Sequence, residues 1–238
     1  MNEEVLTGGG LNQVVRVGAT VRRPVGPWTP RVHELLRRLA PLGVVPKVRG
    51  FDEQGREMLD FLPGEVGHPP IAEHLRGDET LVAVARLIRR MHDASVDLVD
   101  RRGWQFDPIE PIEVIVHGDL APYNMVFHGD QPIGVIDFDT ARPGPRWWDV
   151  AYAVYCLAPF STEFGTPQEQ GRRGALFCAE YGCSNEDLVD HVLARLHDMV
   201  RMIREDPAFR RQRTEQHDEY YLAQVRYVET HRAELAYR

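Results

Sequence analysis

Short segments rich in β-branched residues predict strands in the first sixty residues of the chain. Val14–Val17 and Thr20–Arg23 flank Gly18-Ala19, which is typical of a hairpin. Lys47–Phe51 and Glu57–Leu62 form a second pair around a polar turn that contains glycine. The pattern therefore predicts a small antiparallel sheet near the N-terminal end.

A helix between the two strand pairs is predicted by apolar side chains that recur three or four residues apart. These side chains are Val32, Leu35, Leu36 and Leu39. Thr29 is the expected N-cap, because a threonine side chain accepts hydrogen bonds from the first backbone N–H groups of a helix. Pro30 then suits the first helical position.

Beyond Pro63-Gly64 the pattern becomes mainly helical. Apolar positions predict a helix that ends near Ala94 and a long amphipathic helix from Leu188 to Ile203. The exceptions are a strand at Ile112–Val116 and a hairpin within residues 125–136. From about Trp148 onward we expect only helices.

These segments predict an α+β fold, with a small antiparallel-sheet lobe that contains one helix and a larger, mainly helical lobe. Pro63-Gly64 is the predicted break, which divides the chain into residues 1–62 and 63–238. With 238 residues, the chain is long enough to bury a sizeable core.

Composition and charge narrow the functional classes. The chain is 43% hydrophobic and 27% charged, as in ordinary globular proteins. Its net charge of −8 argues against general nucleic-acid binding, which needs an excess of Lys and Arg. The same charge suits a cationic substrate. Lysine occurs once, at Lys47, so few residues suit a mechanism that needs a lysine.

The cysteines and the N-terminal residues indicate the cellular compartment in which we expect the protein. Cys156, Cys178 and Cys183 show no Cys-x-x-Cys spacing, so we expect a reducing compartment without a disulfide framework or structural zinc. Met1–Glu4 lacks the basic region and apolar run of a signal peptide, and no apolar stretch approaches membrane-spanning length. We expect a cytoplasmic protein without a membrane partner.

The residues best suited to chemistry lie at strand ends and in loops between Val116 and Asp149. Phosphoryl transfer needs a carboxylate that orients and deprotonates the acceptor hydroxyl, together with oxygen ligands for Mg²⁺. Asp119 suits the first role, and Asn124 and Asp137 suit the second. Any one of them alone could simply cap a helix or fill a turn. The ordered set between two β segments favours a catalytic function.

The spacing of these residues leads to a family. Asp119 and Asn124 form Asp-x-x-x-x-Asn, and a strand–turn–strand leads to Asp137, as in protein kinases. His117–Asn124 resembles the His-Gly-Asp-x-x-x-x-Asn motif of aminoglycoside phosphotransferases and their choline-kinase-like relatives. Ile136–Asp139 resembles their metal-binding segment. The resemblance implies a bilobal, protein-kinase-like fold and an enzyme that transfers the γ-phosphoryl group of Mg²⁺-bound ATP or GTP to a small-molecule hydroxyl.

Three neighbouring residues receive roles from the same resemblance. His117 is implied to be a scaffold for the catalytic loop and not a proton carrier. Asp149, in the segment Pro145–Ala151, resembles an aspartate that braces this loop. Asp139 stands where protein kinases have glycine, and two readings remain open for it: a ligand of a second Mg²⁺, or a residue that caps a turn.

Two segments resemble the parts of the family that bind the nucleotide. Gly8-Gly9-Gly10 resembles the glycine-rich turn above the phosphates, where Gly9 and Gly10 would let backbone N–H groups approach the anion. A flexible tail is the alternative. Asp60, Phe61 and Leu62 resemble the hinge whose backbone groups bind adenine, with a core role as the alternative for Phe61.

The residue that should contact the phosphates departs from the family pattern. Relatives carry a lysine on the third strand of the small lobe, and this chain has Arg22-Arg23 there. Arg22 is the expected substitute, with Glu34 as its partner, although arginine differs from lysine in shape and reach. Two solvated arginines on a strand edge are the alternative. Lys47 begins a different strand and is a poorer candidate.

Other functional classes remain open. The missing lysine and the few residues before the glycines would also suit a catalytically silent, kinase-like nucleotide-binding or regulatory protein. A protein kinase is disfavoured, because the segment between Asp137 and Asp149 is too short to dock a peptide. The acceptor is open among aminoglycosides, macrolides, amino alcohols, sugars and homoserine-like molecules.

Overall fold

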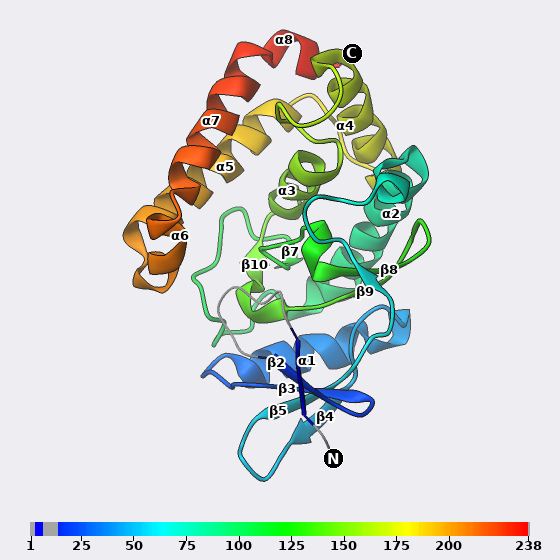
Figure 1. Ribbon diagram of the computed structural model, residues 1–238, viewed down its shortest axis with the longest axis vertical. Helices are drawn as coiled ribbons and strands as arrows, with labels where there is room; N and C mark the ends of the chain where they lie inside the picture. Colours follow the sequence, from blue (N-terminus) through cyan, green and yellow to red (C-terminus); the bar gives the residue numbers. More distant parts are fainter. Residues whose placement is uncertain (1–2, 7–13, 238) are drawn as a thin grey trace. The chain divides into compact units, whose positions relative to one another are not determined.

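The computed structural model describes residues 3–6 and 14–237 of the chain (Figure 1). The chain folds into two compact units. The first unit comprises residues 1–77 and 90–146, and the second comprises 78–89 and 147–238. The expected boundary after Leu62 lies inside the first unit, and the division into lobes at that position stays a prediction.

A five-stranded antiparallel sheet lies in the first unit, and the N-terminal pattern predicted four of its strands but missed the edge strand at Glu4–Leu6. In order across the sheet, its strands are β1 (Glu4–Leu6), β2 (Val14–Val17), β3 (Thr20–Arg23), β5 (Glu57–Asp60) and β4 (Val48–Phe51). Gly18 turns between β2 and β3 with a φ of 62°, a conformation that glycine adopts readily. The register of β3 and β5 sets Arg23 opposite Glu57, so two residues of opposite charge are neighbours in the sheet.

Helix α1 (Thr29–Leu39) buries the four apolar residues that predicted it. The N-cap prediction was wrong, because the helix begins at Thr29 and Trp28 is its N-cap. The N–H groups of Arg31 and Val32, which a Thr29 cap would have bound, donate to the Trp28 carbonyl. The Thr29 hydroxyl instead accepts from the Gly26 N–H at 2.9 Å and closes the turn before the helix.

Two small sheets hold the loops that carry the candidate catalytic residues. Strands β6 (Glu65–Val66), β8 (Met125–His128) and β9 (Gln131–Val135) form one of them, and β7 (Val114–Val116) pairs with β10 (Arg142–Gly144) to form the other. The hairpin of β8 and β9 was predicted. Strands β6 and β10 were not, because one has two residues and the other reads Arg-Pro-Gly, with no β-branched residue.

The described part of the second unit contains helices and no strand, as the C-terminal pattern predicted. It takes residues 78–89 from helix α2 (Asp78–Ser95). The other helices are α3 (Trp147–Leu157), α4 (Pro167–Tyr181), α5 (Leu188–Glu205), α6 (Arg210–Thr214), α7 (His217–Thr230) and α8 (Arg232–Leu235). Helix α5 packs against α3 and α7 (Figure 1). No helix within residues 3–6 and 14–237 is long and apolar enough to span a membrane.

Candidate active site

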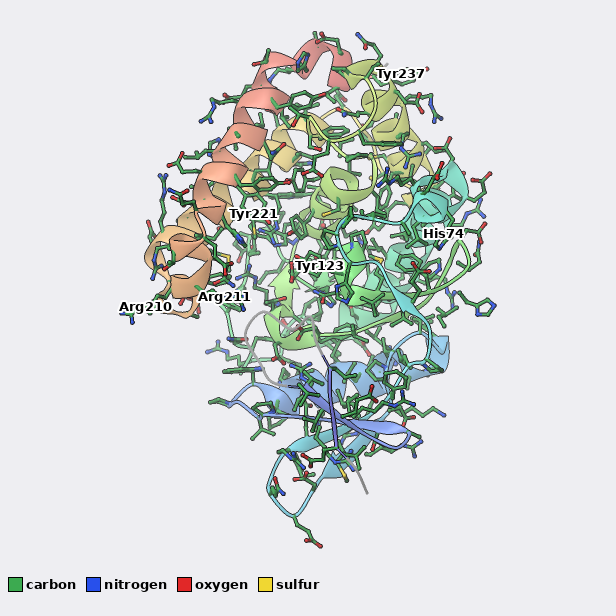
Figure 2. The ribbon with its side chains drawn as sticks, in the orientation of Figure 1. His74, Tyr123, Arg210, Arg211, Tyr221 and Tyr237 are labelled. Carbon is green, nitrogen blue, oxygen red and sulfur yellow. The ribbon has the colours of Figure 1, made fainter. Side chains whose placement is uncertain are left out.

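The loop between β7 and β8 brings Asp119 and Asn124 together. The Asn124 Nδ2 donates to Asp119 Oδ2 at 3.0 Å and to the Asp119 carbonyl at 2.9 Å. The Tyr123 hydroxyl (Figure 2) donates to Asp119 Oδ1 at 2.6 Å. Each carboxylate oxygen therefore accepts a hydrogen bond from a donor of its own loop, and these bonds hold the carboxylate in one orientation.

A glycine in this loop permits close packing against the turn that follows Asp137. Gly118 has a φ of 85°, and a Cβ atom at this position would lie 2.6 Å from the Thr140 carbonyl oxygen. The Thr140 hydroxyl in turn donates to the His117 carbonyl at 2.7 Å. The glycine of the His-Gly-Asp motif is thus required by both its backbone conformation and the lack of space.

His117 and Asn124 hold the residue that precedes Asp137. The His117 Nε2 lies 2.9 Å from the Ile136 carbonyl oxygen, and its Nδ1 accepts from the Asp119 N–H at 3.3 Å. This pair of bonds fits the neutral ring with its proton on Nε2. The Ile136 N–H donates to the Asn124 carbonyl at 2.9 Å. The loop that contains His117 and Asn124 therefore fixes both backbone groups of Ile136, and with them the start of the Asp137 segment.

Asp137 adopts an uncommon backbone conformation. Its φ of 64° and ψ of 63° lie in the left-handed region, which costs a non-glycine residue on the order of 1 kcal/mol. Asp is among the residues that tolerate this region best. The side chain is 50% exposed. Such strain is retained where the surroundings fix it, and it concentrates at functional sites.

The cation beside Asp137 is Arg23, whereas the sequence had suggested Arg22. The Arg23 Nη2 lies 3.2 Å from Asp137 Oδ1. Arg22 instead donates to the Thr20 hydroxyl at 2.6 Å, and its Nε lies 3.6 Å from Asp52 Oδ2. Successive residues of a strand point to opposite faces, so the two arginines cannot share one environment. Which of them faces the site depends on the pairing of β3 with β5.

Arg23 is the centre of a buried ionic cluster. Its Nε lies 3.2 Å from Glu57 Oε1, in an ion-pair contact without a linear hydrogen bond, and its Nη2 donates to Asp139. Glu57 also contacts His33 Nε2 at 2.9 Å. Burial alone would lower the pKa of Arg23, but the charges of Asp137, Asp139 and Glu57 outweigh it and raise this pKa. Arg23 therefore stays charged although it is buried.

Asp139 has a raised pKa for a related reason. Burial disfavours its charged form, and Arg23 only partly offsets this, while Asp137 and Glu57 add repulsion. Three carboxylates thus face a single guanidinium. The surplus of negative charge suits a divalent cation bound at Asp137.

The donor atoms at Asn124 and Asp137 fit Mg²⁺. Mg²⁺ takes one or two carboxylates and completes its coordination with water and substrate phosphates. Because the Asn124 Nδ2 faces Asp119, the other amide atom is the Oδ1 oxygen, which is a suitable ligand. Residues 3–6 and 14–237 contain no group of three or more His, Cys, Asp or Glu residues arranged for a metal.

The predicted hinge has part of its hydrogen bonding inside the sheet. The Asp60 N–H donates to the Lys47 carbonyl at 3.0 Å, and the Phe61 N–H donates to the Ala19 carbonyl at 2.9 Å. The Asp60 carboxylate binds Arg49 in a bidentate manner, at 2.6 and 3.0 Å. These two N–H groups already have partners, so adenine recognition by the segment stays a prediction that centres on its carbonyls and on Leu62.

The structure describes two of the remaining sequence candidates, Glu34 and Asp149. Gly9 and Gly10 fall outside the described residues. Glu34, the expected partner of Arg22, is bound by Arg31, and its Oε1 lies 3.3 Å from Arg101 Nε. Asp149 is buried in the first turn of α3. Sequence reasoning missed Glu57 and Tyr123. The only signal for Glu57 was an acid on the strand that pairs with β3, and the signal for Tyr123 was its position beside Asn124.

Residues 104–186 match the model of the phosphotransferase enzyme family. The trifolitoxin immunity protein of Rhizobium leguminosarum bv. trifolii is 39% identical over 168 residues, which are 66% of this chain and 62% of that protein. An aminoglycoside 3'-phosphotransferase of Escherichia coli is 29% identical over 155 residues, 58% of this chain and 54% of that one. The chain thus spans less than two thirds of the length of either relative.

Solved structures bear on the fold. The amicoumacin kinase hAmiN in complex with AMP-PNP, Ca²⁺ and Ami superimposes with a TM-score of 0.66 at 13% identity, over 94% of this chain and 87% of that one. The ADP-bound aminoglycoside phosphotransferase APH(2'')-Ib gives 0.61 at 15% identity, over 100% and 95%. These matches confirm the predicted α+β, kinase-like fold. The resemblance inferred from the sequence is also confirmed: residues 104–186, which contain Asp119, Asn124 and Asp137, match the model of the phosphotransferase enzyme family.

Proposed function

We propose that this chain is a phosphotransferase that moves the γ-phosphoryl group of ATP or GTP to a hydroxyl of a small molecule. The observation that carries the proposal is the linkage of Asp119, Asn124 and Asp137 through Ile136, whose N–H and carbonyl are both bound by the loop that contains Asp119. A base and two metal ligands with one rigid connection are the parts that phosphoryl transfer needs.

Asp119 is the residue that receives the acceptor proton. Its carboxylate orients the hydroxyl, and the proton moves to the carboxylate as the acceptor oxygen bonds to the γ-phosphorus and the nucleoside diphosphate leaves. Asn124 Oδ1 and the Asp137 carboxylate would hold Mg²⁺, which would neutralise charge on the phosphates. Positioning and electrostatics supply most of the catalysis in this reaction class.

Arg23 acts on the site through Asp137 and Asp139. It balances part of the charge of these two carboxylates and of Glu57, and it ties β3 and β5 to the metal-binding segment. In this proposal Arg23 is a positioning residue, while Gly9, Gly10 and the hinge keep their predicted contacts to the nucleotide.

The names of the relatives indicate a broad class of acceptor molecules. One relative is named for immunity to trifolitoxin and another for aminoglycoside 3'-phosphorylation. We propose an acceptor hydroxyl on an antibiotic, a toxin or another amino sugar or amino alcohol. The net charge of −8 favours a cationic acceptor.

Nucleotide binding by two variants tests the assigned roles. Calorimetry would give the dissociation constant of a non-hydrolysable ATP analogue with Mg²⁺ and with EDTA. We expect Mg²⁺ to strengthen binding to the wild-type protein and to Asp119→Asn, and to have little effect on Asp137→Asn. Mg²⁺-dependent binding that is unchanged in Asp137→Asn would contradict the metal assignment.

A catalytically silent nucleotide-binding or regulatory protein is the second candidate. It is favoured by the replacement of the usual lysine with arginine. Tight Mg²⁺-dependent nucleotide binding without transfer to any acceptor would support it.

A further inference from the structure

The Tyr123 hydroxyl makes the hydrogen bond that the acceptor must make. It donates to Asp119 Oδ1 at 2.6 Å, a short and well-formed contact between a hydroxyl and a carboxylate. In the proposed reaction an acceptor hydroxyl donates to this same carboxylate before its oxygen attacks phosphorus. The chain therefore offers the base an internal hydroxyl of the same kind.

The backbone around Tyr123 is held on both sides. Pro122–Asn124 forms a 3₁₀ turn in which the Asn124 N–H donates to the Ala121 carbonyl at 2.9 Å. The Gly67 N–H donates to the Pro122 carbonyl at 3.2 Å. With the backbone fixed, the hydroxyl can leave Asp119 only through rotation of the two side-chain torsions. Such a movement is local and leaves the loop in place.

The second oxygen of the base is also engaged. Asp119 Oδ2 accepts from the Asn124 Nδ2 at 3.0 Å, and Asn124 is buried. If Asn124 holds the metal through its Oδ1, its amide cannot turn away from Asp119. Oδ1 is therefore the carboxylate oxygen whose partner can change during a catalytic cycle, and that partner is Tyr123.

We propose that Tyr123 is a placeholder at the acceptor position of the catalytic base. Its hydroxyl binds Asp119 Oδ1 while no acceptor is present, keeps water from this oxygen, and gives way to the acceptor hydroxyl. This inference rests on the proposed phosphotransferase function. It adds a residue that discriminates between water and the acceptor, and thereby limits wasteful hydrolysis of the nucleotide.

Hydrolysis in the absence of any acceptor tests this role. Purified protein with Mg²⁺ and ATP would be assayed for phosphate release as wild type, Tyr123→Phe, Asp119→Asn and the double variant. Phenylalanine keeps the ring and removes only the hydroxyl. We expect Tyr123→Phe to raise hydrolysis at least threefold, and the double variant to lose the increase. Tyr237→Phe, a change at an exposed tyrosine near the C-terminus (Figure 2), is the matched control and should leave the rate unchanged.

Several results would overturn the inference. These are hydrolysis by Tyr123→Phe that is equal to or below the wild-type rate, an increase that survives in the double variant, and phosphate attached to Tyr123 itself by peptide mass spectrometry. Calorimetric binding of Mg²⁺-ATP, measured on the same samples, separates failure of the placeholder role from failure of the proposed function. Binding without the increase overturns the placeholder role alone, whereas no nucleotide binding in any sample overturns the proposed function together with it.

Discussion

Replacing Arg23 with methionine removes the charge at the centre of the ionic cluster and keeps much of the side-chain volume. The Arg23 side chain is 8% exposed, and Glu57 is 3% exposed beside it. The substitution leaves Glu57 and Asp139 buried without their cationic partner. We therefore expect a large loss of stability.

The magnitude follows from the geometry. At the 3.2 Å between Arg23 Nε and Glu57 Oε1, an effective dielectric constant of about 20 gives a Coulomb attraction of about 5 kcal/mol. Desolvation of the pair offsets part of this, and removal of one partner of a buried pair costs about 3–5 kcal/mol. Asp137 is half exposed, so its contact adds little. For a chain of this size the loss lowers Tm by about 6–20 °C.

Thermal unfolding followed by circular dichroism measures the effect. The control is Arg22→Met, the same change at the neighbouring position, where the arginine contacts Asp52 instead. We expect a markedly smaller decrease in Tm for the control. Added Mg²⁺ should restore part of the stability of Arg23→Met, because the ion replaces some of the lost positive charge. Equal decreases for the two variants, or a Tm of Arg23→Met within about 2 °C of wild type, would refute the reasoning.

Two further predictions concern the loops of the site. Gly118→Ala should destabilise the chain by more than about 2 kcal/mol and abolish transfer, because its Cβ would lie 2.6 Å from a backbone oxygen. Gly129 also has a positive φ but lies in open space, so Gly129→Ala should cost only about 1 kcal/mol. Chemical denaturation measures both losses. Because the pKa of Asp139 is raised, the folded chain binds this proton more tightly than the unfolded chain, so its contribution to stability falls as pH rises above 3.8. Asp139→Asn should therefore gain stability relative to wild type as pH rises above 3.8; a difference that shrinks as pH rises would contradict the shift.

Local patterns in the sequence predicted the elements that local physics determines. β-Branched runs around Gly18 gave β2 and β3, and helical spacing gave α1 and α5. The order of Asp119, Asn124 and Asp137 predicted the candidate site because these residues lie close in sequence on one loop and one hairpin. Pairing partners were harder to predict, and β10 was missed because its strand forms through contact with β7.

The different environments of the two arginines on β3 could not be predicted from local sequence patterns. Arg22 and Arg23 are adjacent and chemically identical, and only the register of β3 with β5 sets Arg23 opposite Glu57. The bond between Tyr123 and Asp119 likewise depends on the path of the turn at Pro122. Long-range pairing and loop geometry, more than residue type, decide these contacts.

The most direct test of the central claim is transfer of the γ-phosphoryl group itself. Wild type and Asp119→Asn would be incubated with Mg²⁺ and ATP or GTP and a panel of aminoglycosides, macrolides, amino alcohols and sugars, and phosphorylated product would be read by mass spectrometry. The account predicts product from one acceptor class with the wild-type protein and none with Asp119→Asn, which still binds nucleotide. Product formed equally by both proteins would contradict the assignment of Asp119 as the base.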